Sequence, residues 1–239
     1  MASLTRRICL AAFALVVCSA LSAVQAVSSV EARRKALNDL FAEQWEYRLR
    51  TSPLFASFLG DKRWNDKLDD LSQGAVDKDL QETQKFLTRF EAIDTSGFPE
   101  QEALNKTLMV RDLKMHLDSA RFRPWEMPVD QQNGIQIGLP DLVTVLSFQS
   151  VKDYEDYISR LRQIPLALDQ TTVQMRKGMA DKLMPPRFLL GKVVDQCKNL
   201  AYQTPEQSPF AQPFSNFSKD RSEERRVGKE CRSRWSPYH

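Results

Sequence analysis

The segment AVDKDLQETQKFLTRFEAI (residues 75–93) carries an apolar or small side chain at every third or fourth position. Spacings of four, three, four and three residues separate Val76, Leu80, Thr83, Leu87 and Phe90. Because an α-helix turns once in about 3.6 residues, these side chains lie along one face of a helix. The segment therefore predicts an amphipathic helix that packs by a single apolar stripe.

Similar spacing predicts further helices on both sides of this segment. They are expected over residues 30–49, 53–59, 99–120, 150–178 and 187–200. Pro53 and Pro99 stand at or near helix starts, where a missing N–H is tolerated. Short connections favour antiparallel neighbours, and no series of alternating strands appears. The sequence therefore predicts an all-α (mainly α) fold of several helices.

The same spacing assigns individual side chains to the interior. Among the residues expected to be buried are Trp45, Leu104, Leu108, Met115 and Leu168. Ser150 and Asp153 resemble a capping box that opens the helix at 150–178, and Pro165 is expected to kink that helix. Residues 203–218 are rich in Pro, Ser and Phe, which indicates either a linker or a region that needs missing partners.

Residues 122–148 interrupt the helical pattern, because their prolines and glycines do not allow a long helix. Ile135 and Ile137 alternate as in a short extended piece, so we expect the longest irregular stretch here. Long loops in compact domains either cover a functional site or wrap the core, and both readings stay open. The residues expected near a substrate are Asp130, Gln131, Gln132 and Asn133, with loop scaffolding as the alternative.

The first 26 residues are typical of a secretory signal peptide. Arg6 and Arg7 precede an apolar run, and small residues stand before Val27. The run is shorter than the roughly 20 apolar residues of a bilayer span, so we expect cleavage and a secreted or periplasmic protein without an integral membrane span. A lipid anchor on Cys18 is disfavoured, because Val17 stands where bacterial lipoproteins resemble one another in having Gly, Ala or Ser.

The tail RSEERRVGKECRSRWSPYH (residues 221–239) lacks helix and strand periodicity and contains six cations, a Trp and a Cys. A basic, solvated arm is one interpretation. The translation of a common sequencing-library adapter, however, resembles this tail throughout. We therefore predict a signal peptide at 1–26, the N-terminal helical part of a larger domain at 27–220, and a non-native, disordered tail at 221–239.

Both ends contribute to the charge and the cysteine content. The formal net charge of the whole chain is +3. The signal region contributes +2 and the tail +3, so residues 27–220 carry −2. The apparent basicity therefore does not indicate nucleic acid or an anionic membrane as a partner. Of four cysteines only Cys197 lies in residues 27–220, so a disulfide framework is not expected. We expect Cys197 to be a buried, inert thiol on a helix rather than a nucleophile.

Sequence motifs for catalysis are absent from residues 27–220. His116 is the single histidine there, whereas a catalytic zinc generally needs three protein ligands, so we expect a helix-surface or core-edge histidine. Patterns for zinc, nucleotide or serine-hydrolase sites do not occur. Acidic pairs such as Glu43 with Glu46 favour solvated helix faces over glycoside hydrolysis. The sequence predicts no catalytic, cofactor-binding or metal-ligating residue.

Three blocks carry a family resemblance. They are LFAEQWEYRLRTSPLFASFLGD (residues 40–61), VDQQNGIQIGLPDL (residues 129–142) and DYEDYISRLRQIPLALDQTTVQMRKGMADKLMPPR (residues 153–187). In this order they resemble the N-terminal half of the family called domain of unknown function 885, whose members are exported and mostly bacterial. Those members look like helical zinc peptidases with an H-E-x-x-P-G-H-H segment in the C-terminal half.

This chain does not contain that segment, so the resemblance transfers no metal ligand and no general-base glutamate. It implies a parent hydrolase that uses zinc on peptide substrates, with the missing C-terminal half of the domain as the partner of this chain. By itself the chain is then expected to hold no cofactor and to be inactive. The alternative is a noncatalytic exported helical module that binds a partner or a polysaccharide.

Overall fold

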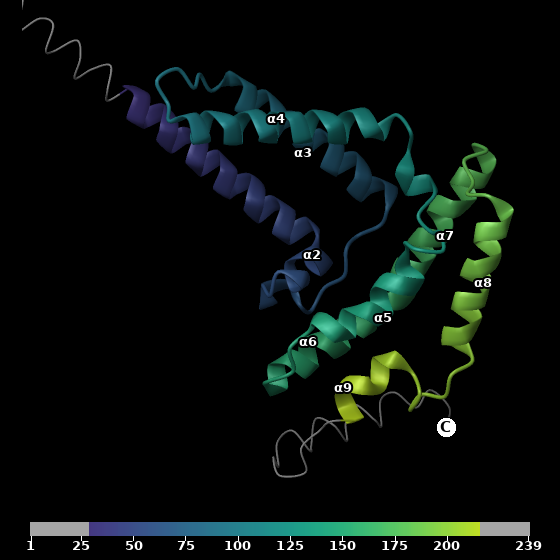
Figure 1. The fold of residues 1–239 in the computed structure, drawn as a ribbon. Helices are drawn as coiled ribbons and strands as arrows, with labels where there is room; N and C mark the ends of the chain where they lie inside the picture. Colours follow the sequence, from purple (N-terminus) through teal and green to yellow (C-terminus); the bar gives the residue numbers. More distant parts are fainter. Residues whose placement is uncertain (1–28, 216–239) are drawn as a thin grey trace, which may run out of the picture. The chain divides into compact units, whose positions relative to one another are not determined.

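A computed structural model of the chain describes residues 29–215 (Figure 1). The first helix covers residues 29–51, and it is followed by α2 (Pro53–Phe58), α3 (Gln73–Ala92), α4 (Glu100–Ala120), α5 (Ile135–Val145), α6 (Val151–Leu161), α7 (Ile164–Ala180), α8 (Arg187–Ala201) and α9 (Gln212–Ser215). Single 3-10 turns are η1 (Lys62–Trp64), η2 (Pro124–Glu126) and η3 (Pro209–Ala211). The described residues contain no strand, which confirms the all-α prediction.

None of the described helices is long and apolar enough to cross a bilayer. The predicted signal peptide, its cysteines and the tail at 221–239 lie outside the described residues.

The described chain divides into two compact units. Unit 1 comprises residues 29–45 and 81–118, and unit 2 comprises residues 46–80 and 119–215. In unit 1 the second half of the apolar stripe predicted on α3 is confirmed, because Thr83, Leu87 and Phe90 are buried there and Phe41 contacts the Phe90 ring at a centroid distance of 5.0 Å. The first half of the stripe, Val76 and Leu80, is only half-buried. Two ion pairs, Arg89 with Glu43 and Arg34 with Glu102, join its helices at the surface.

The rotation of α4 in unit 1 differs from the prediction. Leu104, Leu108 and Met115 are exposed, and Leu113 is the buried apolar residue of this helix. Apolar residues occur on two faces of α4, so spacing does not choose between them. Polar contacts accompany the observed choice, because Lys106 Nζ donates to the carbonyl of residue 93 at 2.8 Å. Trp45, which was also expected inside, is 42% exposed.

In unit 2 the capping box at the start of α6 is confirmed. The backbone N–H of Asp153 donates to Ser150 Oγ at 3.3 Å, and the N–H of Ser150 donates to the Asp153 carboxylate at 2.9 Å. The single kinked helix expected beyond it is wrong. The chain instead ends α6 and begins α7, with Pro165 in the first turn, where a helix tolerates proline. Leu168, expected inside, is exposed on α7.

Two further expectations for unit 2 are corrected. A short extended piece at residues 135–137 is replaced by α5, whose Leu139, Leu142 and Val143 are buried along one face. Pro140 lies in the middle of α5, where it has no N–H to donate to the carbonyl four residues earlier, and the helix continues past it to Val145.

The segment at residues 203–218 was expected as a linker or as needing absent partners; in the structure residues 203–207 are exposed, whereas residues 208–214 pack within unit 2. The Phe214 ring lies 5.9 Å from Tyr154 and 6.0 Å from Tyr157, both on α6. The Tyr157 hydroxyl also donates to the carbonyl of Phe210 at 3.1 Å. Aromatic contacts and one hydrogen bond therefore hold η3 and α9 to α6.

A row of glutamines on one face of α7 and its N-cap binds the extended connection before α3: Gln163, Gln170 and Gln174. Gln163 accepts the N–H of Leu68 at 3.1 Å and donates to the carbonyl of Asp66 at 2.7 Å. Gln170 accepts the N–H of Leu71 at 3.0 Å. These contacts satisfy main-chain groups that no regular element satisfies. The connection is thereby held without a strand partner.

Candidate functional site

Asp130, one of the residues predicted near a substrate, organises a tight turn in unit 2. Its carboxylate Oδ1 accepts the backbone N–H of Gln132 at 2.6 Å and that of Asn133 at 2.8 Å. The N–H of Asp130 in turn donates to the carbonyl of Asn133 at 2.8 Å. The Gln132 N–H, with the side chain and N–H of Asn133, lowers the pKa of Asp130. This carboxylate is therefore held ionised and used by its own loop.

Two glutamines connect this turn to its neighbours. Gln136, on α5, donates through Nε2 to the carbonyl of Asp130 at 2.8 Å and to Gln196 Oε1 at 3.3 Å. Gln196, on α8, donates to the carbonyl of Gln131 at 3.0 Å. Gly134 has a φ of +127°, and a Cβ there would lie 2.4 Å from Gln136 Oε1. Only glycine fits between the turn and this amide.

A buried ionic cluster lies a few residues earlier, at η2. Glu126 is 1% exposed, and its Oε1 pairs with Lys177 on α7 and, at 3.4 Å, with Arg123. Arg123 also pairs with Asp181, just after α7. Gly178 allows this approach, because a Cβ there would lie 2.1 Å from the Glu126 carbonyl oxygen. The two cations and two carboxylates neutralise one another within the cluster.

The stretch from η2 to the start of α5 is distinguished by buried polar atoms without a hydrogen-bond partner among the described residues. Four such atoms lie there, namely Trp125 Nε1, Glu126 Oε2, Gln131 Oε1 and Gln136 Oε1. Most buried polar side-chain atoms in proteins have a partner, so their concentration within twelve residues marks residues 125–136 as the candidate site. The three oxygens can accept N–H or O–H groups of a ligand.

Arg160 forms a second buried polar centre in unit 2, which motif searching missed. Its side chain is 1% exposed, and Nη2 donates to Ser57 Oγ at 2.9 Å and to the carbonyl of Trp64 at 2.8 Å. Burial lowers the pKa of Arg160 to about 10, against the attraction of Asp69 and other acids. Burial likewise raises the pKa of Asp69. Spacing offered one signal, because Arg160 follows Tyr154 and Tyr157 on the inward face of α6.

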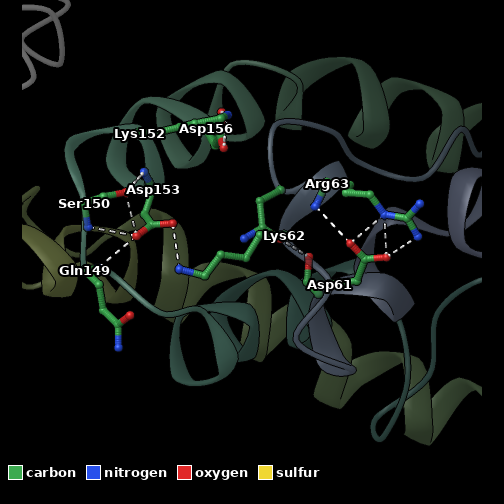
Figure 2. Close-up of polar contacts among 10 residues, drawn as sticks. Asp61, Lys62, Arg63, Gln149, Ser150, Lys152, Asp153 and Asp156 are labelled. Atoms are coloured by element: carbon green, nitrogen blue, oxygen red, sulfur yellow. Dashed lines mark hydrogen bonds and ion pairs between the residues drawn. The ribbon is translucent and has the colours of Figure 1, made fainter.

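The capping box of α6 joins a partly buried ion pair, which Figure 2 shows. Asp153 is 8% exposed, and its Oδ1 accepts from Lys62 Nζ of η1 at 2.9 Å. Burial raises the pKa of Asp153, but Lys62 and the N–H groups of Gln149 and Ser150 lower it more, so the net pKa lies below the usual value. This contact fixes η1 to the start of α6 and presents no free reactive group.

No group of three or more His, Cys, Asp or Glu side chains within residues 29–215 is arranged to hold a metal ion. His116 is exposed on α4, as expected for a helix-surface histidine.

Cys197 is exposed on α8, so the prediction of a buried thiol is wrong. Val193 is the buried residue of α8, whereas Cys197, about one helical turn further along, is exposed to solvent. A depression of about 390 Å³ on α3 is lined only by residues of that helix.

Comparison with known proteins gives a family match. Residues 53–237 match the sequence model of a family described as "Bacterial protein of unknown function (DUF885)". The match includes residues 221–237, for which we predicted a non-native origin, and that origin stays a prediction. A search of curated proteins found no match.

Proposed function

Since this match covers more than half of the 239 residues, the protein belongs to the DUF885 family of bacterial proteins, and we propose that it is the N-terminal helical part of an exported metallopeptidase-like hydrolase. The order of the three blocks at residues 40–61, 129–142 and 153–187 supports this assignment, because they resemble the N-terminal half of zinc-peptidase-like members.

The described residues do not fit a zinc site. They offer one histidine and no convergent set of three ligands, whereas catalytic zinc takes three protein ligands and an open position. The metal ligands of the parent would therefore come from chain outside residues 29–215. No catalytic step is assigned to the side chains described above.

What residues 125–136 supply to such an enzyme is hydrogen-bonding capacity beside a peptide. The observation that carries this role is the concentration of buried polar atoms without a partner in that stretch. Two of them are side-chain carbonyl oxygens, on Gln131 and Gln136, which suit the main-chain N–H groups of a polypeptide. The Asp130 turn and Gln196 hold these glutamines in place.

Reading the native gene beyond the codon for Asp220 tests the assignment. An H-E-x-x-P-G-H-H segment with further acidic ligands is expected downstream, and the tail at 221–239 should be missing from genomic DNA. The full parent should then bind zinc stoichiometrically and cleave peptides, whereas the present chain should do neither after dialysis. A native reading frame without that segment would instead support a noncatalytic helical binding module.

A pair of variants in the full parent tests the role of the loop. Gln131→Ala removes one of the carbonyl acceptors, and Gln132→Ala, its exposed neighbour, serves as the matched control. We expect Gln131→Ala to lower kcat/KM about tenfold or more for peptides, in line with a lost hydrogen bond worth about 1–2 kcal/mol, and Gln132→Ala to leave it nearly unchanged. Equal activity of the two variants would show that the loop is only a scaffold.

Export and assembly follow from the same proposal. N-terminal sequencing of the exported protein should begin at Val27. The exposed apolar residues of α4 in unit 1, Leu104, Leu108 and Met115, would meet the missing half of the domain, so residues 27–220 alone should be poorly soluble. A monodisperse and cooperatively melting preparation of residues 27–220 would contradict this expectation.

A further inference from the structure

The turn between α7 and α8 exposes bulky apolar side chains. Met179 is 59% exposed, Met184 49% and Phe188 71%, and all three fall within ten consecutive residues of unit 2. Figure 1 shows this turn at one end of the two helices. We call residues 176–192 the α7–α8 tip. Three exposed Met and Phe side chains within ten residues, one at the end of α7, one in the turn and one at the start of α8, are unlike the singly scattered apolar residues of most surfaces.

Cations stand close to these apolar residues in the sequence. Residues 176–192 carry five cations and one acid, a net charge of +4, although residues 27–220 together carry −2. The single acid, Asp181, pairs with Arg123, and Lys177 pairs with the buried Glu126. Within the described residues, no hydrogen bond or ion pair engages the side chains of the remaining four, namely Arg176, Lys182, Arg187 and Lys192. The local charge is therefore available to a partner.

The backbone of the tip is held in one conformation. The N–H of Asp181 donates to the carbonyl of Lys177 at 2.9 Å, and the N–H of Leu183 donates to the carbonyl of Gly178 at 2.8 Å. Pro185 and Pro186 then restrict the chain before α8. The backbone that carries Met184 is thus held in an ordered turn, and Phe188 stands in the first turn of α8, so this part of the main chain does not need to be ordered on binding, which lowers the entropy cost of an interaction.

We propose that the α7–α8 tip docks on an anionic phospholipid surface, with Met179, Met184 and Phe188 entering the headgroup region and the unpaired cations contacting lipid phosphates. Lys is depleted from the cores of protein interfaces, whereas Lys and Arg beside aromatic and aliphatic side chains suit a charged lipid interface. Long Lys and Arg side chains also keep their charge in water while apolar neighbours enter the membrane. This inference is independent of the proposed hydrolase activity.

Vesicle flotation with charge-matched variants tests the proposal. The full chain is mixed with vesicles of equal parts phosphatidylglycerol and phosphatidylcholine, or with vesicles of phosphatidylcholine alone. The tip variant is Lys182→Gln with Arg187→Gln, and the control is Arg162→Gln with Lys198→Gln, near the opposite ends of α7 and α8. Both variants lose two charges, so any contribution of the basic tail to binding is the same in each.

The expected result is a fall in partitioning to the anionic vesicles of roughly fivefold for each tip cation lost, hence about 25-fold for the tip variant. The control should change little, because Lys198 lies about 16 Å along α8 from Arg187, beyond a Debye length of about 10 Å. Phe188→Ser, on α8, should weaken binding more than Leu166→Ser, which removes another well-exposed apolar residue (60% exposed, against 71% for Phe188) near the N-terminus of α7. Circular dichroism verifies that each variant folds.

Three results would overturn the proposal. They are equal binding of the tip and control variants, equal binding to anionic and neutral vesicles, and binding that added salt does not weaken. Polyglutamate serves as an acidic polypeptide probe. If the tip variant loses polyglutamate binding but keeps vesicle binding, the surface takes an acidic polypeptide and not a lipid.

Discussion

Replacing Gly178 by alanine tests how closely η2 approaches α7. A Cβ at this position would lie 2.1 Å from the carbonyl oxygen of Glu126 and 2.9 Å from that of Leu183. Both atoms belong to the backbone, so no side-chain rotation relieves the contact. Alanine favours a helix over glycine by about 1 kcal/mol, whereas forced overpacking costs about 1–3 kcal/mol. Moving η2 also disturbs the buried pair of Glu126 with Lys177, so we expect a net loss of about 2 kcal/mol.

Gly191 provides the matched control, because it lies inside α8 and a Cβ there would meet nothing within 4 Å. Gly191→Ala should raise stability by about 0.5–1 kcal/mol through helix propensity alone. Urea unfolding followed by far-ultraviolet circular dichroism measures both variants, and thermal midpoints provide a second reading. If Gly178→Ala proves as stable as Gly191→Ala, the close backbone approach is wrong. A stabilised Gly178→Ala would also remove the reason given for the buried position of Glu126.

Three more predictions concern polar groups of unit 2. The pKa of Asp153 is lower in the folded than in the unfolded chain, so the stability that its ionised carboxylate contributes is complete above about pH 5 and is lost as the pH falls through the pKa of the folded state. The difference in unfolding free energy between the unsubstituted chain and Asp153→Asn, measured by urea titration, should therefore shrink on acidification. Arg160→Met should cost about 3–5 kcal/mol, because it leaves Ser57 Oγ and the carbonyl of Trp64 without their buried donor and removes the charge that attracts Asp69. Adding Asp69→Asn should restore part of the loss in a double-mutant cycle. Tyr157→Phe should cost about 1 kcal/mol and increase hydrogen exchange in residues 209–215, measured by mass spectrometry.

Helix positions and one cap could be read from the sequence because their causes are local. The α3 stripe and the capping box of Ser150 with Asp153 depend on residues a few positions apart, so spacing carries the information. The rotation of α4 could not be read in this way, since apolar residues occur on two of its faces. The observed rotation is accompanied by a contact of Lys106 with a carbonyl at residue 93, thirteen positions earlier, which helical spacing does not encode.

The middle of the chain shows how composition misleads. Gly134 and Pro140 indicated an irregular stretch, yet Ile135, Leu139, Leu142 and Val143 hold helical spacing and α5 forms. Counting that spacing would have found the helix.

The candidate site was predicted only as a region. Asp130, Gln131, Gln132 and Asn133 do come together in one turn, but Asp130 serves the loop itself. The buried Glu126 and its partners on α7 could not be foreseen, because residues about fifty positions apart meet there. Likewise, the guanidinium of Arg160 meets Ser57 across about a hundred residues, and no periodic pattern encodes that contact.

The glutamine row on α7 determines which sequence changes the connection at residues 66–71 can accept. Gln163 and Gln170 contact the main chain at Leu68 and Leu71, not their side chains. Almost any amino acid can therefore replace these two leucines without losing the hydrogen bonds, and proline is the exception because it has no N–H. In a library randomised at both positions and sorted for folded protein, polar and apolar residues should survive together. Gln163 and Gln170, in contrast, should tolerate few replacements, since each of these two amides donates and accepts at once.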